Sequence, residues 1–124
     1  MNKQEVSYIY RSIFVYRLTM NILYTGGYRA RFKKIQQIIN QYHPKSIVEL
    51  CFGDTLIADY CQSNNIKWKG FDLNTYFVTE AKKKKYDAER VDLLSISEFP
   101  KSDVCIMIGS LYHFNDDIDS LLAK

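Results

Sequence analysis

Four carboxylates lie where short apolar runs of this sequence end, and each can accept hydrogen bonds from a polar ligand. Glu49 lies within the run 47–50, and Asp54 follows in the next turn. Asp72 and Asp92 come directly after the two following runs. Asp72 lies 23 residues beyond Glu49, close to the offset of about 20 residues at which an acidic side chain meets a ribose in βαβ units. Because a carboxylate can accept two hydrogen bonds from a vicinal diol, this spacing predicts a nucleoside site, with helix capping by Asp72 as the alternative.

The turn after residue 50 is poor in glycine. Its sequence is Cys51-Phe52-Gly53-Asp54-Thr55, which lacks the G-x-G-x-x-G pattern of dinucleotide-binding turns. Glycines in that pattern let the backbone approach a pyrophosphate closely, and the carboxylates beside this turn would repel phosphate. A ligand with a cationic or zwitterionic end therefore fits the turn better than NAD or ATP does.

Few other side chains suggest chemistry. Cys51, Cys61 and Cys105 form no C-x-x-C pair, which predicts reduced thiols and no metal site. Tyr112 and His113 are the candidate pair for handling a proton near the expected site, with a structural role for the histidine as the alternative. The residues that could act in catalysis are therefore left open.

The spacing of apolar residues predicts elements that bring these groups together. Helical periodicity predicts two N-terminal helices, and a strand–helix alternation begins at residue 46. The predicted helices are 3–24, 28–42, 55–63, 75–84, a single turn at 95–99 and 116–123, and the predicted strands are 46–50, 67–71, 88–91 and 103–108. Such alternation predicts an α/β, Rossmann-like fold, a parallel sheet of about four strands in the order 3-2-1-4 within three α/β/α layers.

The fourth predicted strand is the most apolar segment of the sequence. Residues 104–108 are Val, Cys, Ile, Met and Ile, a run typical of a strand buried on both faces of a parallel sheet. No further strand pattern follows it, so the predicted order places it at an edge. Because apolar edge strands are prone to association, we expect a homodimer or another partner at this edge.

Length and charge narrow the class of protein. The 124 residues fit one domain, with residues 1–44 as an N-terminal helical part and residues 45–124 as the core. A net charge of +3 does not indicate nucleic-acid binding, and the lysines at 82–85 are expected at a solvated helix end, with a nucleic-acid patch as the alternative. The N-terminus is too polar for a secretory signal, and no apolar run approaches the ~20 residues that span a bilayer. We therefore expect a soluble, cytoplasmic protein without a membrane segment.

Four short segments together resemble the successive motifs of Rossmann-like S-adenosylmethionine-dependent methyltransferases. They are residues 48–55, 70–74, 91–94 and 103–107, and the resemblance covers roughly residues 45–115. In that family the first motif is acidic-x-Gly-x-Gly-x-Gly. This sequence matches it at Glu49 and Gly53, with Cys51 and Thr55 at the outer glycine positions. The resemblance implies S-adenosylmethionine as cofactor, S-adenosylhomocysteine as product and transfer of a methyl group to an unknown acceptor.

The resemblance also implies a role for each candidate cofactor-binding residue. The implied residues are Glu49, Cys51, Phe52, Gly53 and Asp54 for the methionine moiety, Asp72 for the ribose hydroxyls, Leu73 against the adenine, Asp92 and Leu93 at the adenine edge, and Ser110 and Leu111 near the sulfonium. The N-terminal helices resemble a lid. In this lid Tyr24 and Tyr28 are candidates to close over the cofactor, with ordinary packing as the alternative.

The sequence departs from that family in two ways. It stops after one helix beyond the fourth strand, whereas the family continues with further strands. It also lacks the Asn-Pro-Pro-Tyr type motif of amino-directed methyltransferases and has Gly-Ser-Leu-Tyr-His-Phe at 109–114 instead. A shortened methyltransferase and a non-catalytic cofactor-binding half-domain that acts through a protein partner are both compatible with these departures. A nicotinamide-dependent reductase is disfavoured by the missing glycines.

Overall fold

The computed structural model describes residues 27–108 and 116–124. The chain divides into two compact units, residues 1–43 and residues 44–124, and each is described by itself. The predicted helix at 3–24 lies outside the described residues.

The described part of the first unit is helix α2, Gly27–Tyr42, which agrees with the helix predicted at 28–42. Ile39 is buried, whereas the basic side chains of the helix are exposed. After the helix, His43 adopts a left-handed backbone with a φ of 47°, and its N–H donates to the Ile39 carbonyl at 3.0 Å. Pro44 follows and cannot donate a further helical hydrogen bond, so the helix ends where the sequence predicts.

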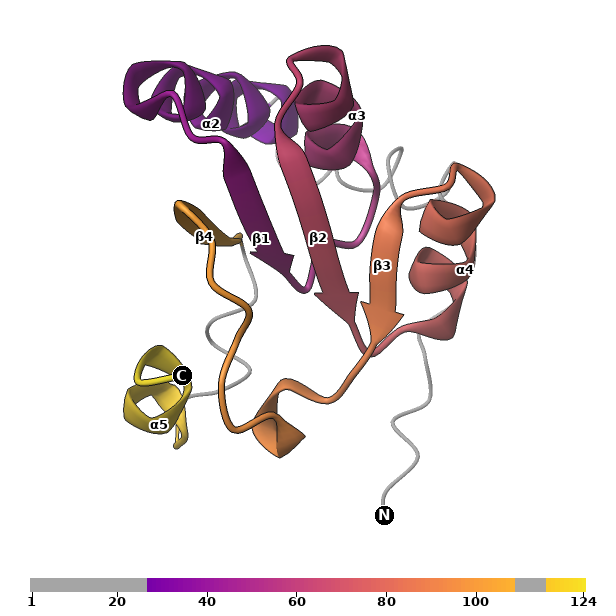
Figure 1. Cartoon of the computed structure of the whole chain (residues 1–124), viewed down its shortest axis with the longest axis vertical. Coiled ribbons are helices and arrows are strands. Elements are labelled where there is room, and N and C mark those ends of the chain that lie inside the picture. Colours follow the sequence, from indigo (N-terminus) through magenta and orange to yellow (C-terminus); the bar gives the residue numbers. More distant parts are fainter. Residues whose placement is uncertain (1–26, 109–115) are drawn as a thin grey trace. The chain divides into compact units, whose positions relative to one another are not determined.

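The second unit is built around a parallel sheet (Figure 1). In sheet order its strands are β3 (Asp87–Arg90), β2 (Lys67–Asp72), β1 (Ser46–Leu50) and β4 (Val104–Met107). The remaining elements are α3 (Leu56–Ser63), α4 (Thr75–Lys83), the 3-10 helix η2 (Leu93–Ser95) and α5 (Ile118–Leu122). The described strands pair in parallel in the order 3-2-1-4, which confirms the predicted α/β, Rossmann-like fold.

The side chains of β1 alternate between the two faces of the sheet and are buried on both. Val48 and Leu50 face one side, where they form a core with Phe71, Leu93 and Leu121. Phe71 lies directly beside Leu50 in the parallel register, so its side chain joins the same face. The other face of β1 carries Glu49, and this is the face that bears the polar groups of the candidate site.

Two local predictions are wrong. The single helical turn begins at Leu93 rather than at residue 95, because the Asp92 carboxylate accepts a hydrogen bond from the Leu94 N–H at 3.0 Å and caps it there. The fourth strand is not buried on both faces: Cys105 is exposed and its neighbours in β4 are only partly buried. This follows from the position of β4 at the edge of the sheet, where β1 is its described neighbour.

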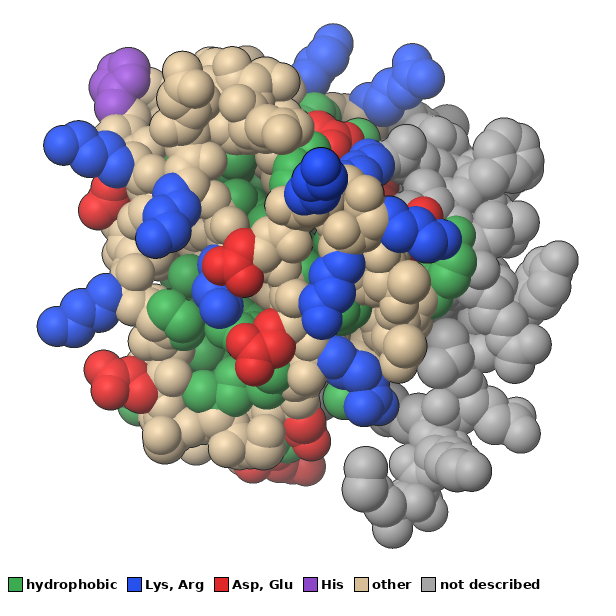
Figure 2. All heavy atoms as spheres, turned by 45° about the vertical axis from the view of Figure 1, so that its right-hand side comes forward, with side chains coloured by type: hydrophobic (Ala, Val, Ile, Leu, Met, Phe, Trp, Pro, Cys, Tyr) green, Lys and Arg blue, Asp and Glu red, His purple; other side chains and the backbone are tan. Residues whose placement is uncertain are grey.

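Charge is mixed on the surface of the molecule. Figure 2 shows Lys and Arg side chains interspersed with Asp and Glu side chains on the face that it presents. In the lysine run at 82–85, Lys83 pairs with Glu80 at 2.7 Å and Lys84 pairs with Asp59 at 3.3 Å. Among the described residues, none of the helices has the length and apolar composition needed to cross a membrane.

Candidate functional site

The turn after β1 and the end of β2 are joined by backbone and side-chain hydrogen bonds. The N–H of Cys51 donates to the Phe71 carbonyl at 2.7 Å, which extends the β1–β2 pairing into the turn. Cys51 and Gly53 then adopt positive φ angles of 53° and 63°. The cysteine is held in a backbone region that L-residues rarely adopt, and Gly53 adopts it without steric penalty. These two residues reverse the chain between β1 and α3.

Asp72, the last residue of β2, fixes this turn. One oxygen of its carboxylate accepts from the Gly53 N–H at 3.0 Å, and the other accepts from the Asn74 N–H at 2.8 Å. Burial raises the pKa of Asp72 above its usual value, and backbone hydrogen bonds from Asn74, Gly53 and Leu73 partly offset this effect. The cap of α4 is Asn74, whose side chain accepts from the Tyr76 N–H, so helix capping is not the role of Asp72. A carboxylate has about four acceptor sites, so three backbone donors leave Asp72 some acceptor capacity for a ligand.

Glu49 is buried beneath the same turn, and 4% of its surface is exposed. Its carboxylate accepts a hydrogen bond from the Trp68 indole N–H at 2.8 Å. Burial raises the pKa of Glu49 well above 4.5; the Trp68 hydrogen bond opposes this effect, and the nearby carboxylates of Asp54 and Asp72 add to it. The structure therefore brings three of the four predicted carboxylates together, and the innermost is held by a partner of its own.

The indole ring of Trp68 lies over Gly70, which is two residues further along the same strand, β2. A side chain at Gly70 would overlap the indole ring and would also lie 2.6 Å from the Phe52 ring, so only glycine fits beneath this tryptophan. Phe52 contacts Trp68 edge-on, with ring centroids 5.2 Å apart. Phe52 was predicted to contact the cofactor. Its side chain is instead buried against Trp68, on the inner side of the turn.

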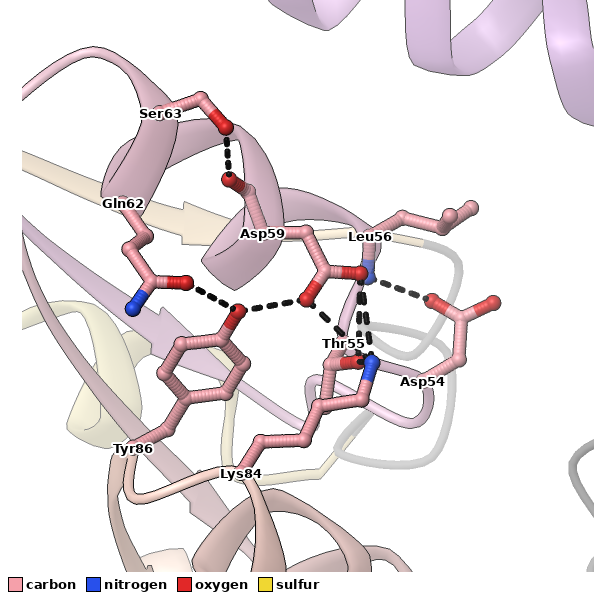
Figure 3. Close-up of polar contacts among 8 residues, drawn as sticks. All are labelled: Asp54, Thr55, Leu56, Asp59, Gln62, Ser63, Lys84 and Tyr86. Atoms are coloured by element: carbon pink, nitrogen blue, oxygen red, sulfur yellow. Dashed lines mark hydrogen bonds and ion pairs between the residues drawn. The ribbon is translucent and has the colours of Figure 1, made fainter.

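The N-terminus of α3 is already occupied by side chains of the protein. The Asp54 carboxylate accepts from the Leu56 N–H at 3.2 Å, the kind of bond that an anionic ligand would otherwise make. Thr55 is fully buried, and its hydroxyl accepts from the Lys84 ammonium at 2.7 Å. The same ammonium lies 3.3 Å from an Asp59 oxygen. In this arrangement (Figure 3) Asp54 occupies a hydrogen-bond donor of α3 that a phosphate would otherwise use.

Tyr86, which precedes β3, completes this network. Its hydroxyl donates to the Asp59 carboxylate and lies 3.0 Å from the Gln62 side-chain oxygen (Figure 3). Burial, together with the hydrogen bond to Asp59, raises the pKa of Tyr86 to about 12. Lys84 and Tyr86 tie the segment between α4 and β3 to α3. Trp68 and Tyr86 were not predicted from the sequence, and Lys84 was expected only within a solvated run of lysines, because long-range hydrogen bonds have no signature in spacing.

The residues that follow β2 and β3 lie at the same end of the sheet. The Val91 N–H donates to the Asp72 carbonyl at 3.1 Å, which places the start of the Asp92 segment beside Asp72. Leu73 is 49% exposed, and the Arg90 guanidinium donates to its carbonyl at 3.1 Å. An exposed leucine next to a carboxylate offers an apolar surface beside a polar anchor.

Asp92 and Leu93 differ in what they offer a ligand. Asp92 is exposed, although one oxygen of its carboxylate already caps η2. Leu93 is 3% exposed and belongs to the core cluster with Val48 and Leu50, so its side chain is turned away from the expected adenine. Of the two residues predicted at the adenine edge, Asp92 is the one with free surface.

The other predicted residues cannot be placed at the site. Tyr24, Ser110, Leu111, Tyr112 and His113 lie outside the described residues. Tyr28 lies in the first turn of α2, in the other unit of the chain. Within residues 27–108 and 116–124, no group of three His, Cys, Asp or Glu side chains is arranged to hold a metal ion.

A pocket of about 540 Å³ lies at the ends of β1 and β4. Leu50 and Met107, the last residues of those strands, form part of its wall on the face opposite to Glu49. Its other lining residues are Glu98, Phe99, Pro100, Lys101, Ser102, Cys105, Leu121, Leu122 and Lys124. None of the described residues predicted to bind the cofactor lines it, so this pocket and the carboxylate cluster are separate features.

Comparisons of the chain with protein-family models, with curated proteins and with solved structures find no match.

Proposed function

We propose that this chain binds S-adenosylmethionine at the C-terminal ends of β1 and β2 and acts as a methyltransferase. The observation that carries the proposal is Asp72, a buried carboxylate at the tip of β2 that is tied to the turn after β1. In doubly wound parallel sheets, ligands bind beyond the carboxyl ends of the strands. The Asp72 carboxylate keeps acceptor capacity beyond its backbone partners, which suits a ribose hydroxyl.

The charge of the turn supports a cationic ligand. Glu49, Asp54 and Asp72 place three carboxyl groups around Gly53, and Asp54 accepts a hydrogen bond at the end of α3 where a phosphate would bind. S-adenosylmethionine carries a sulfonium, an ammonium and a carboxylate, and it has no phosphate. A cationic centre near the turn stabilises the ionised carboxylates, whereas NAD or ATP would bring like charge into it.

The residues fit the remaining parts of this ligand. The exposed face of Leu73 suits the adenine ring, and the exposed Asp92 carboxylate suits its amino group. When bound, S-adenosylmethionine supplies an electrophilic methyl group on its sulfonium. The contribution of this chain is to orient the cofactor through Asp72 and to surround the sulfonium with negative charge, since displacement at a methyl group depends mainly on positioning.

Calorimetric titration with S-adenosylmethionine, S-adenosylhomocysteine, NAD and ATP tests the proposal. We expect both adenosyl ligands to bind, and NAD and ATP not to bind. The Asp72→Ala variant is expected to weaken S-adenosylhomocysteine binding by about 1.5–3 kcal/mol, the range for a hydrogen bond to a charged group. Asp87→Ala is the matched control, because this exposed aspartate lies on β3 and pairs with Lys69. Unchanged affinity in Asp72→Ala, or preferential binding of NAD, would contradict the proposal.

A second candidate is a cofactor-binding domain that acts through a protein partner without catalysis. The apolar strand β4 at the edge of the sheet favours this alternative, because an open edge is a surface for association. The two functions separate in one assay with radiolabelled S-adenosylmethionine and a panel of nucleic acid, protein and small-molecule acceptors. Cofactor binding with label transfer supports the methyltransferase, and binding without transfer to any acceptor supports the second candidate.

A further inference from the structure

The two edges of the sheet differ in how they meet solvent. At one edge β3 has the sequence Asp87-Ala88-Glu89-Arg90, with charged side chains at three of its four positions. Charges of this kind protect an edge strand from pairing with another chain. At the other edge β4 has the sequence Val104-Cys105-Ile106-Met107, without a charge or a proline. Edge protection is therefore present on β3 and missing on β4.

The surface beside β4 carries apolar side chains next to Glu98, Lys101 and Lys124. Cys105 is exposed, and Leu122 of α5 is 72% exposed. Both residues line the 540 Å³ pocket, together with Phe99 and Met107. Among the described residues, β1 is the strand that pairs with β4, and it occupies one side only. Within residues 27–108 and 116–124 no strand pairs with the outer side of β4, and the Val104 carbonyl accepts a hydrogen bond from the Ser102 hydroxyl at 3.0 Å. An edge of this kind can pair with another strand.

We propose that a second copy of this chain pairs with β4, so that two β4 strands join the sheets of the two copies edge to edge. A two-fold axis makes such a pair antiparallel and closes the assembly at two subunits. β4 is complementary to itself, because its four apolar side chains meet four apolar side chains. Pairing of β4 with the β3 strand of another copy would set Asp87 and Glu89 against this apolar strand and would extend without closure.

The same axis brings the two pockets together. A two-fold axis perpendicular to the sheet keeps equivalent faces of both copies on the same side. Cys105 and Met107 project to the face that carries Leu50, so the pocket of each copy lies next to that of its partner. The exposed Leu122 then lies beside the joint and adds apolar area to the contact. This association does not depend on the proposed cofactor.

Sedimentation equilibrium of the whole chain at micromolar concentrations tests the proposal first. We expect a mass twice that of the 14.6 kDa chain. Cys105→Lys introduces an exposed cation into the edge strand and is expected to give a monomer. Glu89→Lys is the matched control at the β3 edge and is expected to stay dimeric. A monomeric wild-type chain, or a dimer that persists in Cys105→Lys, would overturn the proposal.

Thiol cross-linking locates the contact in the unmodified protein and does not depend on how a variant folds. A short bis-maleimide adds one thiol from each copy across its two double bonds. In an antiparallel β4 pair the two Cys105 thiols lie on neighbouring strands, so peptide mapping is expected to find the link at Cys105 of both copies. Cys61 is buried and serves as the internal negative control. A cross-linked dimer that maps to other residues would overturn the β4 contact.

Discussion

On one side of β1, buried carboxylates are held by hydrogen bonds from distant segments, whereas on the other side an apolar strand at the edge of the sheet lies beside a pocket. The first side, here called the β2 flank, comprises β2, β3, α3 and α4. It contains Glu49 under Trp68, Asp72 across two backbone N–H groups, and Lys84 between α3 and the end of α4. The second side, the β4 flank, comprises β4, α5 and residues 98–102, and it contains the pocket.

The difference shows how one small sheet can present two kinds of surface. In the β2 flank, buried carboxyl groups are retained because each has a hydrogen-bond donor, so an acidic group can be kept at a fixed place for a ligand. In the β4 flank, apolar side chains at an edge have little to hold them in a monomer and favour contact with another chain. The five comparisons that follow test this division, from the largest expected effect to the smallest.

Trp68→Ala is expected to have the largest effect, because Trp68 is buried between Phe52 and Tyr86 and is the donor to Glu49. Loss of a buried tryptophan costs about 3–5 kcal/mol of unfolding free energy. Urea unfolding followed by circular dichroism measures it.

The double variant Trp68→Ala/Gly70→Ala tests whether the two residues contact each other. Gly70→Ala alone is expected to destabilise by about 1–3 kcal/mol, because the added methyl group overlaps the indole. In the absence of the indole that penalty should largely disappear. Additive effects of the two substitutions would contradict the contact.

Asp72→Ala is expected to come next in its effect on stability. It removes the acceptor of the Gly53 and Asn74 N–H groups, and a buried donor left without a partner costs about 1–3 kcal/mol. Thermal unfolding measures the loss without ligand. Asp87→Ala, in which an exposed aspartate is removed from β3, should change stability by less than about 0.5 kcal/mol. Equal effects of the two substitutions would remove the distinction between the tip of β2 and the surface of β3.

Glu49→Gln is expected to alter the pH dependence of stability. The pKa of Glu49 is raised in the folded state, so the folded protein holds this proton more tightly than the unfolded chain does. The contribution of Glu49 to stability is therefore fully present below pH 4.5 and declines as pH rises through the folded pKa, by at most about 1.4 kcal/mol per pH unit.

Glutamine keeps the acceptor for Trp68 but carries no charge, so the variant should lose this decline. Urea unfolding from pH 4 upward, at a fixed ionic strength, compares the two proteins. Glu89→Gln is the control at an exposed position of β3 and should retain the wild-type profile. Parallel profiles for wild type and Glu49→Gln would show that Glu49 is not buried in this way.

Two cysteine substitutions compare the flanks directly, because each removes the same sulfur atom. Cys61 in α3 has none of its surface exposed, and burial raises its pKa to about 12. Cys61→Ala should cost about 0.5–1.5 kcal/mol, as for other small deletions in a core. Cys105→Ala, on the exposed β4 edge, should stay within about 0.5 kcal/mol of the wild type. A larger loss at Cys105 than at Cys61 would reverse the comparison.

Lys84→Ala, the last comparison, is expected to have a small effect on stability. The Lys84–Asp59 ion pair is partly exposed, and such pairs contribute about 0.2–1 kcal/mol. Lys83→Ala is the matched control, since Lys83 pairs with Glu80 on the surface of the same helix and should change stability less. Chemical unfolding at low and at high salt measures both, and the Lys84 effect should shrink as salt screens the pair.

The sequence predicted the fold closely where local pattern decides structure. The apolar run that became β1, the turn at Gly53 and the end of α2 before Pro44 all depend on neighbouring residues, and all were predicted. The start of η2 was misplaced because Asp92 caps it, and a capping bond competes with periodicity over only two or three residues. The burial of β4 was misjudged because apolar composition does not say whether a strand is central or at an edge.

Less of the candidate site was open to prediction. Carboxylates at strand ends were found from spacing, and Glu49, Asp54 and Asp72 do lie together. The donor to Glu49, however, is a tryptophan 19 residues away, and Leu93, which spacing put at the ligand, packs into the core. Which side of a strand or turn a side chain takes depends on its partners in other segments.

By itself the sequence determined the alternation of strands and helices, the strand order 3-2-1-4 and the set of acidic residues at the strand ends, because these follow from local periodicity and from the handedness of crossovers. Only the tertiary structure decided which carboxylates are buried, which donors hold them and which edge of the sheet stays apolar. Those outcomes depend on contacts between residues far apart in the chain, because a carboxylate can be buried only where another segment supplies its hydrogen-bond donor.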